Sequence, residues 1–262
     1  MRTVTATRYV TPLREGGSLP AVIEADDDGL YVLKFRGAGQ GPKALIAELV
    51  AGEIARALGL PVPEIVLVEL DPELARTEPD PEIQDLIRAS GGLNLALDYL
   101  SGALAFDPLA DPVDAELASR IVWFDALVTN LDRTVRNTNM LIWHRQLWLI
   151  DHGAALYFQH GGLGDAAAAT RPFPLIRDHV LLGTADRIEA VDAAMAALLP
   201  PATLQGIVGL LPEDWLRSAP TSADEPRQVH EHRAAYVDHL ARRLAAPRAF
   251  VQEAARARHA HV

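Results

Sequence analysis

The chain contains no cysteine, so disulfide bridges, cysteine-ligated zinc and thiol catalysis are all excluded. It is also short of basic residues, with 24 Lys and Arg against 35 Asp and Glu and a formal net charge of -11. Nucleic-acid backbones are bound by clustered cations, so this balance argues against a nucleic-acid partner. No stretch approaches the ~18 uncharged apolar residues that a membrane-spanning helix requires, so we expect no membrane span.

The two ends of the chain add little to these exclusions. Residues 1–10 are polar and lack the apolar run of a secretory signal, which together with the missing apolar span predicts a cytoplasmic location. Arginines gather only between Arg242 and Arg258. We expect that stretch to form a solvated helix face followed by a frayed tail.

The overall composition is that of a globular protein, with 49% hydrophobic and 23% charged residues. A length of 262 residues exceeds the usual single domain and favours one large domain or two lobes. Strand patterns dominate the first third of the chain and helical patterns the rest. The sequence therefore predicts an α+β fold, with a β-rich lobe carrying one helix over residues 1–96 and a helical lobe over residues 97–262.

The β-rich part begins with alternating polar and apolar residues over 4–10. Two further strands, over 21–25 and 30–35, flank the turn Asp26-Asp27-Asp28-Gly29 and should form a hairpin. Helical periodicity follows over 43–58, with Gly59 as a stop signal. A strand is then expected over 65–70. It is followed by an acidic, proline-bearing stretch that predicts a surface loop or a short helix, and then by a short apolar segment over 93–100.

The second part begins with an apolar helix over 115–129, followed by a polar loop over 130–139. Two short apolar strands, over 140–143 and 147–150, surround a turn. Residues 159–170 are rich in Gly and Ala and are expected to be mobile. Helices are then predicted over the ranges 184–199, 202–211 and 225–245.

Two polar motifs stand where these elements end. Asp132 and Asn137 lie five residues apart in the polar loop, and Asp151-His152-Gly153 directly follows a strand. Mg²⁺ prefers oxygen ligands and takes only one or two protein carboxylates when phosphates and water complete its shell. Asn137 and Asp151 are suited to that task, which leaves Asp132 to accept a proton from an attacking hydroxyl.

Two more features lie in the β-rich part. Lys34 shares a strand face with Val32, and that face should look into a cleft. Glu48 follows fourteen residues later on the next helix, where its carboxylate could orient the Lys34 amine toward phosphates. The turn Gly16-Gly17-Ser18 offers backbone N–H groups that can cradle phosphate oxygens.

Each of these features alone also has a structural interpretation. Asp132 could cap a helix or sit in a turn, and Lys34 could protect a sheet edge. Asn139 competes with Asn137 as metal ligand, and the spacing favours Asn137. Glu53, five positions further along and on a different helical face, competes with Glu48 as partner of Lys34. The histidines fit no compact zinc-ligand spacing.

Taken together and in this order, the motifs resemble those of the protein-kinase-like superfamily. The stretch Asp132-Arg133-x-x-x-Asn137 is similar to the catalytic loops of HipA-like and phosphoinositide kinases, and over residues 8–215 the chain resembles a HipA-like kinase domain. The resemblance implies a bilobal kinase fold and phosphoryl transfer from ATP with Mg²⁺. The acceptor would be a hydroxyl on a protein Ser or Thr, a peptide or a small molecule.

The resemblance also implies roles for residues on the β-rich side of the cleft. Lys34 would contact the α- and β-phosphates and pair with Glu48, and the Gly16-Gly17-Ser18 turn would cover the phosphates. The hinge between lobes, whose backbone would contact adenine, would be Leu97, Asp98, Tyr99 and Leu100.

On the helical side, the resemblance makes Asp132 the catalytic base and gives Mg²⁺ to Asn137 and Asp151. Arg136 would stabilise charge on the γ-phosphate. Three departures leave substrate class and regulation open: Asn130-Leu131-Asp132 stands where protein kinases have His-Arg-Asp, His152 replaces Phe in the metal motif, and the phosphate turn is short. A nucleotide-binding pseudokinase or partner subunit is the alternative function, and nucleotidyl transfer on the same fold is a third.

Overall fold

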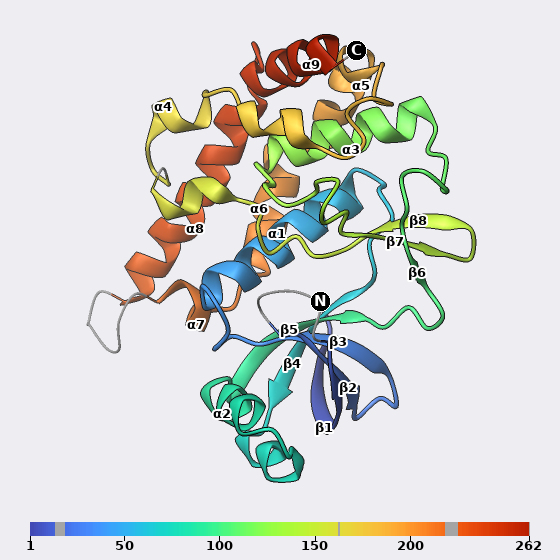
Figure 1. Cartoon of the computed structure of the whole chain (residues 1–262). Helices are drawn as coiled ribbons and strands as arrows, with labels where there is room; N and C mark the ends of the chain where they lie inside the picture. Colours follow the sequence, from blue (N-terminus) through green and yellow to red (C-terminus); the bar gives the residue numbers. More distant parts are fainter. Residues whose placement is uncertain (14–18, 162, 218–224, 262) are drawn as a thin grey trace.

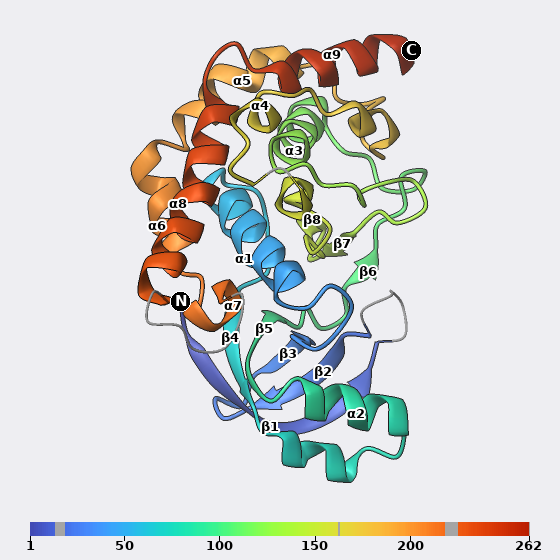
Figure 2. The same ribbon diagram turned by 90° about the vertical axis from the view of Figure 1, so that its left-hand side faces the viewer.

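The computed structural model describes residues 1–13, 19–161, 163–217 and 225–261 (Figure 1). A small β-rich lobe lies below a larger helical lobe, and helix α1 (Pro42–Ala57) lies between them (Figures 1 and 2). The protein therefore has the α+β, two-lobed architecture expected from its sequence.

The β-rich lobe is a closed five-stranded barrel with strand order β1-β2-β3-β5-β4. All neighbours pair antiparallel except β1 and β4, which pair in parallel and close the barrel. The expected hairpin is β2 and β3, with Val22 opposite Val32. The strands are β1 (Thr3–Pro12), β2 (Ala21–Ala25), β3 (Leu30–Lys34), β4 (Ile65–Leu70) and β5 (Gly92–Asp98).

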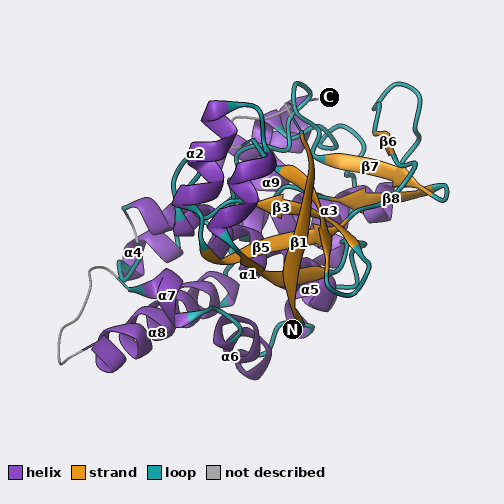
Figure 3. Ribbon diagram, turned by 90° about the horizontal axis from the view of Figure 1, so that it is seen from below, coloured by secondary structure: helices purple, strands orange, loops and turns teal. Residues whose placement is uncertain are grey.

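Alternation along the barrel strands separates two hydrophobic cores. On β5, Ala96 faces the barrel interior, while Leu95 and Leu97 face the core of the helical lobe. The 3₁₀ helix η1 (Pro72–Thr77) and helix α2 (Pro81–Ala89) lie against the barrel, as seen from below in Figure 3. The acidic stretch thus forms helices, and the Asp80 side chain caps α2 by accepting from Glu82 N.

Helix α1 belongs to the larger core rather than to the barrel interior. Its residues from Leu45 to Ala55 are buried on almost every side, Glu53 being the partly exposed exception. A helix buried all round shows little amphipathic contrast, and this one packs against both β5 and the helices α6 (Pro201–Gly209) and α7 (Glu213–Leu216). Because of this position, the side chain of Glu48 on α1 faces strand β3 of the barrel.

The helical lobe is built around α3 (Ala115–Leu127), which packs on α5, α8 and α9. A small sheet with order β6-β7-β8 lies beside it. Residues 159–170, which we expected to be mobile, include the short helix α4. The remaining elements are β6 (Leu104–Ala105), β7 (Met140–Trp143), β8 (Gln146–Leu149), η2 (Tyr157–His160), α4 (Ala166–Ala169), η3 (Pro174–Asp178), α5 (Ile188–Ala197), α8 (Glu225–Leu244) and α9 (Ala249–His261).

The expectation of a frayed, solvated C-terminal stretch was wrong. Residues 249–261 form α9, and Phe250 packs edge-on against Trp123 with ring centroids 5.3 Å apart. Arg243 is buried and donates hydrogen bonds to the carbonyls of Ala126 and Leu127. Those carbonyls end α3 and lack partners within the helix, so a buried guanidinium is satisfied there.

The predicted boundary between the lobes, at residues 96 and 97, stays a prediction. Strand β5 of the barrel continues to Asp98. In the described residues, no single helix has the length and apolar character needed to cross a bilayer. The bent pair of Ile188–Ala197 and Pro201–Gly209 passes such a test together, at an angle of 73°.

Candidate active site

Lys34 reaches out of the barrel into the space between the lobes. On β3 the side chain of Leu33 is fully buried inside the barrel, so the side chain of Lys34 points to the opposite face. Its Nζ donates a hydrogen bond to Glu48 Oε2 at 2.7 Å and a second to Asp151 Oδ1. Three elements from both lobes therefore meet at one amine.

The charges at this meeting point stabilise one another. Burial lowers the pKa of Lys34, but the charges of Glu48 and Asp151 outweigh it and leave the pKa above its ordinary value. Burial likewise raises the pKa of Glu48, and the Lys34 charge reverses the effect and holds it well below its ordinary value. Both groups are charged at neutral pH.

The loop after α3 presents Asp132 with two asparagines around its carboxylate. Asp132 Oδ2 accepts from Asn137 Nδ2 at 2.8 Å and from Asn139 Nδ2 at 3.3 Å. Asn139 Nδ2 also lies 3.3 Å from the Asp132 carbonyl and 3.5 Å from the Asp151 carbonyl. Asn139 thus connects the Asp132 loop to the Asp151 loop, whereas Asn137 contacts the Asp132 side alone.

A buried charged cluster supports this loop from behind, and the sequence analysis missed it. Asp125 on α3 accepts from Arg133 Nε at 2.6 Å, from Asn130 Nδ2 at 2.8 Å and from His179 Nε2 at 2.9 Å. His179 Nδ1 accepts from Leu181 N at 3.0 Å, so Nε2 carries the proton that is shared with Asp125. A lone carboxylate within the apolar run 121–128 is the sequence signal for such a cluster.

The cluster holds the Asp132 loop through two further hydrogen bonds. Asn130 Oδ1 accepts from the backbone N–H of Asp132 at 3.1 Å, and Arg133 donates to the carbonyl of Asn139. Burial would raise the pKa of Asp125, but the Arg133 charge and the His179 hydrogen bond hold it well below its ordinary value. Asp125 therefore acts as an ionised anchor for the loop.

A cleft with a volume of about 1200 Å³ lies between the lobes. Its lining includes Lys34 and Val32 from β3, Asn137 and Asn139 from the loop, and Asp151. Glu48 lies behind Lys34, and Asp132 adjoins the lining through the two asparagines.

The predicted hinge residues form part of the same lining: Leu97, Asp98, Tyr99 and Leu100. The backbone N–H groups of Asp98 and Tyr99 are already bonded to Glu64 O and Leu30 O, at 2.8 and 2.9 Å. Within the described chain, the N–H of Leu100 has no hydrogen-bond partner. Among the described residues, Leu100 is thus the one of these three whose backbone N–H has no hydrogen-bond partner.

The outcome differs for the other four predicted residues and for the competitor Glu53. Gly16, Gly17 and Ser18 fall outside the described residues. Arg136 is exposed on the Asp132 loop, and its side chain has no hydrogen bond or ion pair within the described chain. Glu53 pairs with Arg56 at 3.2 Å on another face of α1, so Glu48 alone of the two glutamates contacts Lys34.

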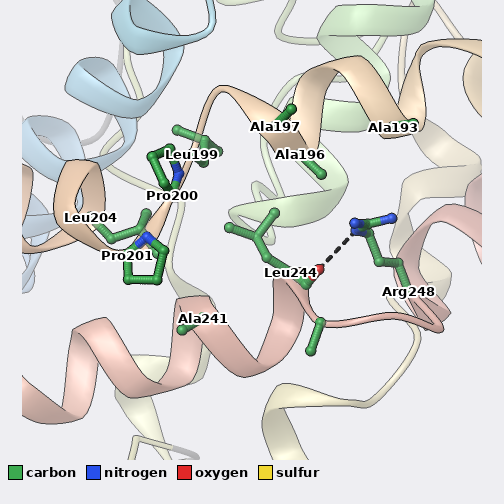
Figure 4. Close-up of a pocket in the computed structure, with 11 residues that line it drawn as sticks. Ala193, Ala196, Ala197, Leu199, Pro200, Pro201, Leu204, Ala241, Leu244 and Arg248 are labelled. Carbon is green, nitrogen blue, oxygen red and sulfur yellow. Dashed lines mark hydrogen bonds between the residues drawn. The ribbon is translucent and has the colours of Figure 1, made fainter.

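A second, smaller hollow of about 450 Å³ lies between α5, α6 and α8 (Figure 4). Of the described residues that line it, only Arg248 is charged; the others are Ala, Leu and Pro. Arg248 Nε donates to Leu244 O at 2.8 Å (Figure 4). This hollow offers packing surface but no constellation for chemistry.

A family model for HipA-like kinases matches residues 7–243. The chain belongs to the HipA-like kinase family. The match spans the barrel, α1, the Asp132 loop and most of the helical lobe. Membership in this family makes the protein a kinase-like phosphotransferase.

One solved structure of low sequence identity shares the fold of this HipA-like kinase, and two others are similar to it at lower scores. The Helicobacter pylori proinflammatory kinase CtkA matches with 14% identity and a TM-score of 0.53, over 99% of each chain. Two structures of the Golgi casein kinase, one with Mn/ADP bound, match at TM-scores of 0.45 and 0.46 with 13% and 12% identity. They cover 95% of this chain and 77% and 75% of theirs. No curated protein matches the chain.

Proposed function

We propose that this HipA-like kinase transfers the γ-phosphoryl group of ATP, with Mg²⁺, to a hydroxyl acceptor. The observation that carries the proposal is the contact of Lys34 with both Glu48 and Asp151 at a cleft also lined by Asn137 and Asn139. Phosphoryl transfer needs a cation on the phosphates, oxygen ligands for a metal and a group that orients the attacking hydroxyl. The cleft provides a candidate for each.

ATP would lie with its base at the hinge and its phosphates near Lys34. The free N–H of Leu100 suits a ring nitrogen of adenine, and the apolar side chains of Val32 and Leu97 line the cleft beside it. The Lys34 amine is held by its hydrogen bond to Glu48 and would contact the α- and β-phosphates of ATP. The Gly16-Gly17-Ser18 turn is proposed to cover them.

The donor set beside Lys34 fits a hard divalent cation. Asp151 supplies a carboxylate that is 43% exposed. The amide oxygens of Asn137 and Asn139 accept no hydrogen bond from the described chain, so both are available to a metal. We propose that Asp151 and one of the two asparagines hold Mg²⁺; the contacts of Asn139 with both loops favour Asn139. Bound there, Mg²⁺ would neutralise charge on the phosphate oxygens.

Asp132 is proposed as the base that orients the acceptor hydroxyl. Its Oδ2 is held by two amides, while its Oδ1 has no partner among the described residues. Held in this way, the carboxylate can accept a proton without changing its position. Arg136, four residues further along the loop, is free to approach the γ-phosphate.

Family membership and net charge support a proposal for the acceptor class. We propose a Ser or Thr hydroxyl of a protein or peptide, with a small-molecule alcohol as the other candidate. A net charge of -11 favours basic over acidic acceptors, because long-range attraction raises their encounter rate.

The test is transfer of label from γ-³²P-ATP and from α-³²P-ATP, with autophosphorylation and a basic Ser/Thr peptide as acceptors. We expect transfer from the γ-label alone, reduced by about 10²-fold or more in Asp132→Ala and Asp151→Ala. The control is Asp238→Ala, which removes an exposed ion pair with Arg242 and should leave the rate unchanged. Binding of MgATP without transfer indicates a pseudokinase, and transfer from the α-label indicates nucleotidyl transfer.

A further inference from the structure

His152 is a fully buried histidine next to the proposed metal ligand Asp151, and the proposed function gives it no role. Its Nδ1 lies 3.3 Å from Glu48 Oε1. The Glu48 carboxylate is ionised and can only accept, so Nδ1 carries the proton of this hydrogen bond. The other ring nitrogen, Nε2, is buried with no partner in the part of the chain that the structure describes. Among the described residues, the one polar contact of the His152 side chain is therefore with Glu48.

The two oxygens of Glu48 are used by two different partners. Oε2 accepts from Lys34 at 2.7 Å, and Oε1 faces His152. A carboxylate held at one oxygen can still rotate about its terminal bond, whereas one held at both oxygens has a defined plane. Glu48 has no exposed surface, so water cannot replace a lost partner at Oε1.

The ring of His152 also packs as an aromatic residue. It meets Phe124 of α3 edge-on, with ring centroids 5.7 Å apart. A phenylalanine at this position would preserve that packing but would donate no hydrogen bond. Histidine provides both the aromatic packing and the hydrogen bond, so substitutions that keep only one of them separate the two contributions.

We propose that His152 is a positioning residue that fixes the Glu48 carboxylate, and through it the Lys34 amine, in the geometry that binds ATP phosphates. This inference rests on the proposed function for the role of Lys34 but goes beyond it. It assigns a role to the histidine that follows Asp151, the proposed metal ligand. In this proposal the hydrogen-bonded residues His152, Glu48 and Lys34 together set the position of the amine.

The test compares two substitutions that each keep one property of the ring. His152→Phe keeps the aromatic packing and removes the donor, whereas His152→Asn keeps an N–H near the place of Nδ1 and removes most of the ring. We expect His152→Phe to lose about tenfold or more in kcat/KM for MgATP, because a hydrogen bond to a charged group is lost. His152→Asn should retain activity within about threefold of the wild type.

The kinetic form of the loss separates positioning from general damage. A misplaced amine raises KM for MgATP and leaves KM for the acceptor peptide unchanged, whereas partial unfolding lowers kcat alone. In a Glu48→Gln background, His152→Phe should have no further effect on kcat/KM. Full activity of His152→Phe, or a greater loss in His152→Asn than in His152→Phe, overturns the proposal.

A second measurement keeps this inference separate from the proposed function. Urea unfolding of His152→Phe, Glu48→Gln and the double variant forms a double-mutant cycle that needs no activity. We expect the double variant to lose clearly less stability than the sum of the single losses. Additive losses show that the two side chains do not interact and overturn the inference. If the wild type transfers no phosphate but the cycle is non-additive, the proposed function alone has failed.

Discussion

Lys34 and Asp151 are in direct contact although 117 residues separate them along the chain. The contact joins the barrel to the loop that follows β8, across the cleft between the lobes. It places a cation and a candidate metal ligand side by side, where phosphate oxygens would need both.

Replacing Lys34 with methionine should destabilise the protein as well as abolish transfer. Glu48 would remain fully buried without a cation, and breaking such a pair costs about 3 to 5 kcal/mol in the free energy of unfolding. Urea unfolding measures this loss. Adding Glu48→Gln to Lys34→Met should recover part of it, because the buried charge is then removed.

The control for Lys34→Met is Lys43→Met at the start of α1. Lys43 is exposed, and within the described part of the chain its amine donates only to the backbone carbonyl of Gln159, at 3.3 Å. We expect little change in stability or in affinity for ATP. Equal stability of Lys34→Met and the wild type would show that the buried ion pair does not form in solution.

The metal ligands can be separated by substituting the two asparagines individually. If Asn139 is the ligand, Asn139→Ala should raise the Mg²⁺ concentration required for half-maximal activity by about tenfold or more, and Asn137→Ala should change it far less. The measurement is initial rate against free Mg²⁺ at saturating ATP, after removal of metal with EDTA. The reverse order of effects assigns the metal to Asn137 instead.

Asp125→Asn should weaken the support of the Asp132 loop. Arg133 has no exposed surface and would be left without its carboxylate partner, so we expect a loss of about 3 to 5 kcal/mol in unfolding free energy. Asp238→Asn, at an exposed ion pair, should change stability by less than about 1 kcal/mol. A loss at Asp125 no greater than at Asp238 contradicts the buried cluster.

Asp125 should also contribute to the acid sensitivity of the fold. Its folded pKa lies below the ordinary 3.8, so the unfolded state binds the proton first as pH falls. The stabilisation is complete above the ordinary pKa and is lost as pH falls through the folded value. The free energy of unfolding of the wild type should therefore fall more steeply between about pH 6 and pH 2 than that of Asp125→Asn. Urea unfolding at a series of pH values measures both.

His239 should cause a separate loss of stability at mildly acidic pH. Burial lowers its pKa from 6.5 to about 4, with the Arg243 charge adding to the effect and Asp238 and Asp165 opposing it. The unfolded chain takes up a proton near pH 6.5 but the folded chain only near 4, so stability declines as pH falls between these values.

The substitution that tests this is His239→Phe. It keeps the ring that stacks on Phe158, with centroids 3.7 Å apart, and removes the titration. We expect the drop in Tm between pH 7 and pH 5 to be smaller in the variant than in the wild type. An identical drop in both proteins means that His239 does not contribute.

Much of the fold follows from local patterns. The strands over 21–25 and 65–70 coincide with β2 and β4, and the helix expected over 43–58 differs from α1 by one residue at each end. Such agreement is expected where alternation or helical periodicity is strong and turn residues stand at the ends. The C-terminal helix α9 was missed because its burial depends on Trp123, which lies far away in the sequence.

The candidate site likewise contains residues that were predicted from the sequence and residues that only the structure revealed. Residue type, position at the ends of elements and the resemblance to HipA-like kinases together predicted Lys34, Asp132 and Asp151 as functional residues, and their roles stay predictions. Spacing did not reveal the cluster of Asp125, Arg133 and His179, whose members are brought together only by packing.

The amino-acid sequence by itself determined most of the segments that form strands and helices, although not α9, and which polar residues stand at their ends, since these depend on neighbours within a few positions. Tertiary structure alone decided that β1 closes the barrel beside β4 and that His152 faces Glu48. Those choices depend on how buried faces fit together and on the need to pair every charge that packing removes from water.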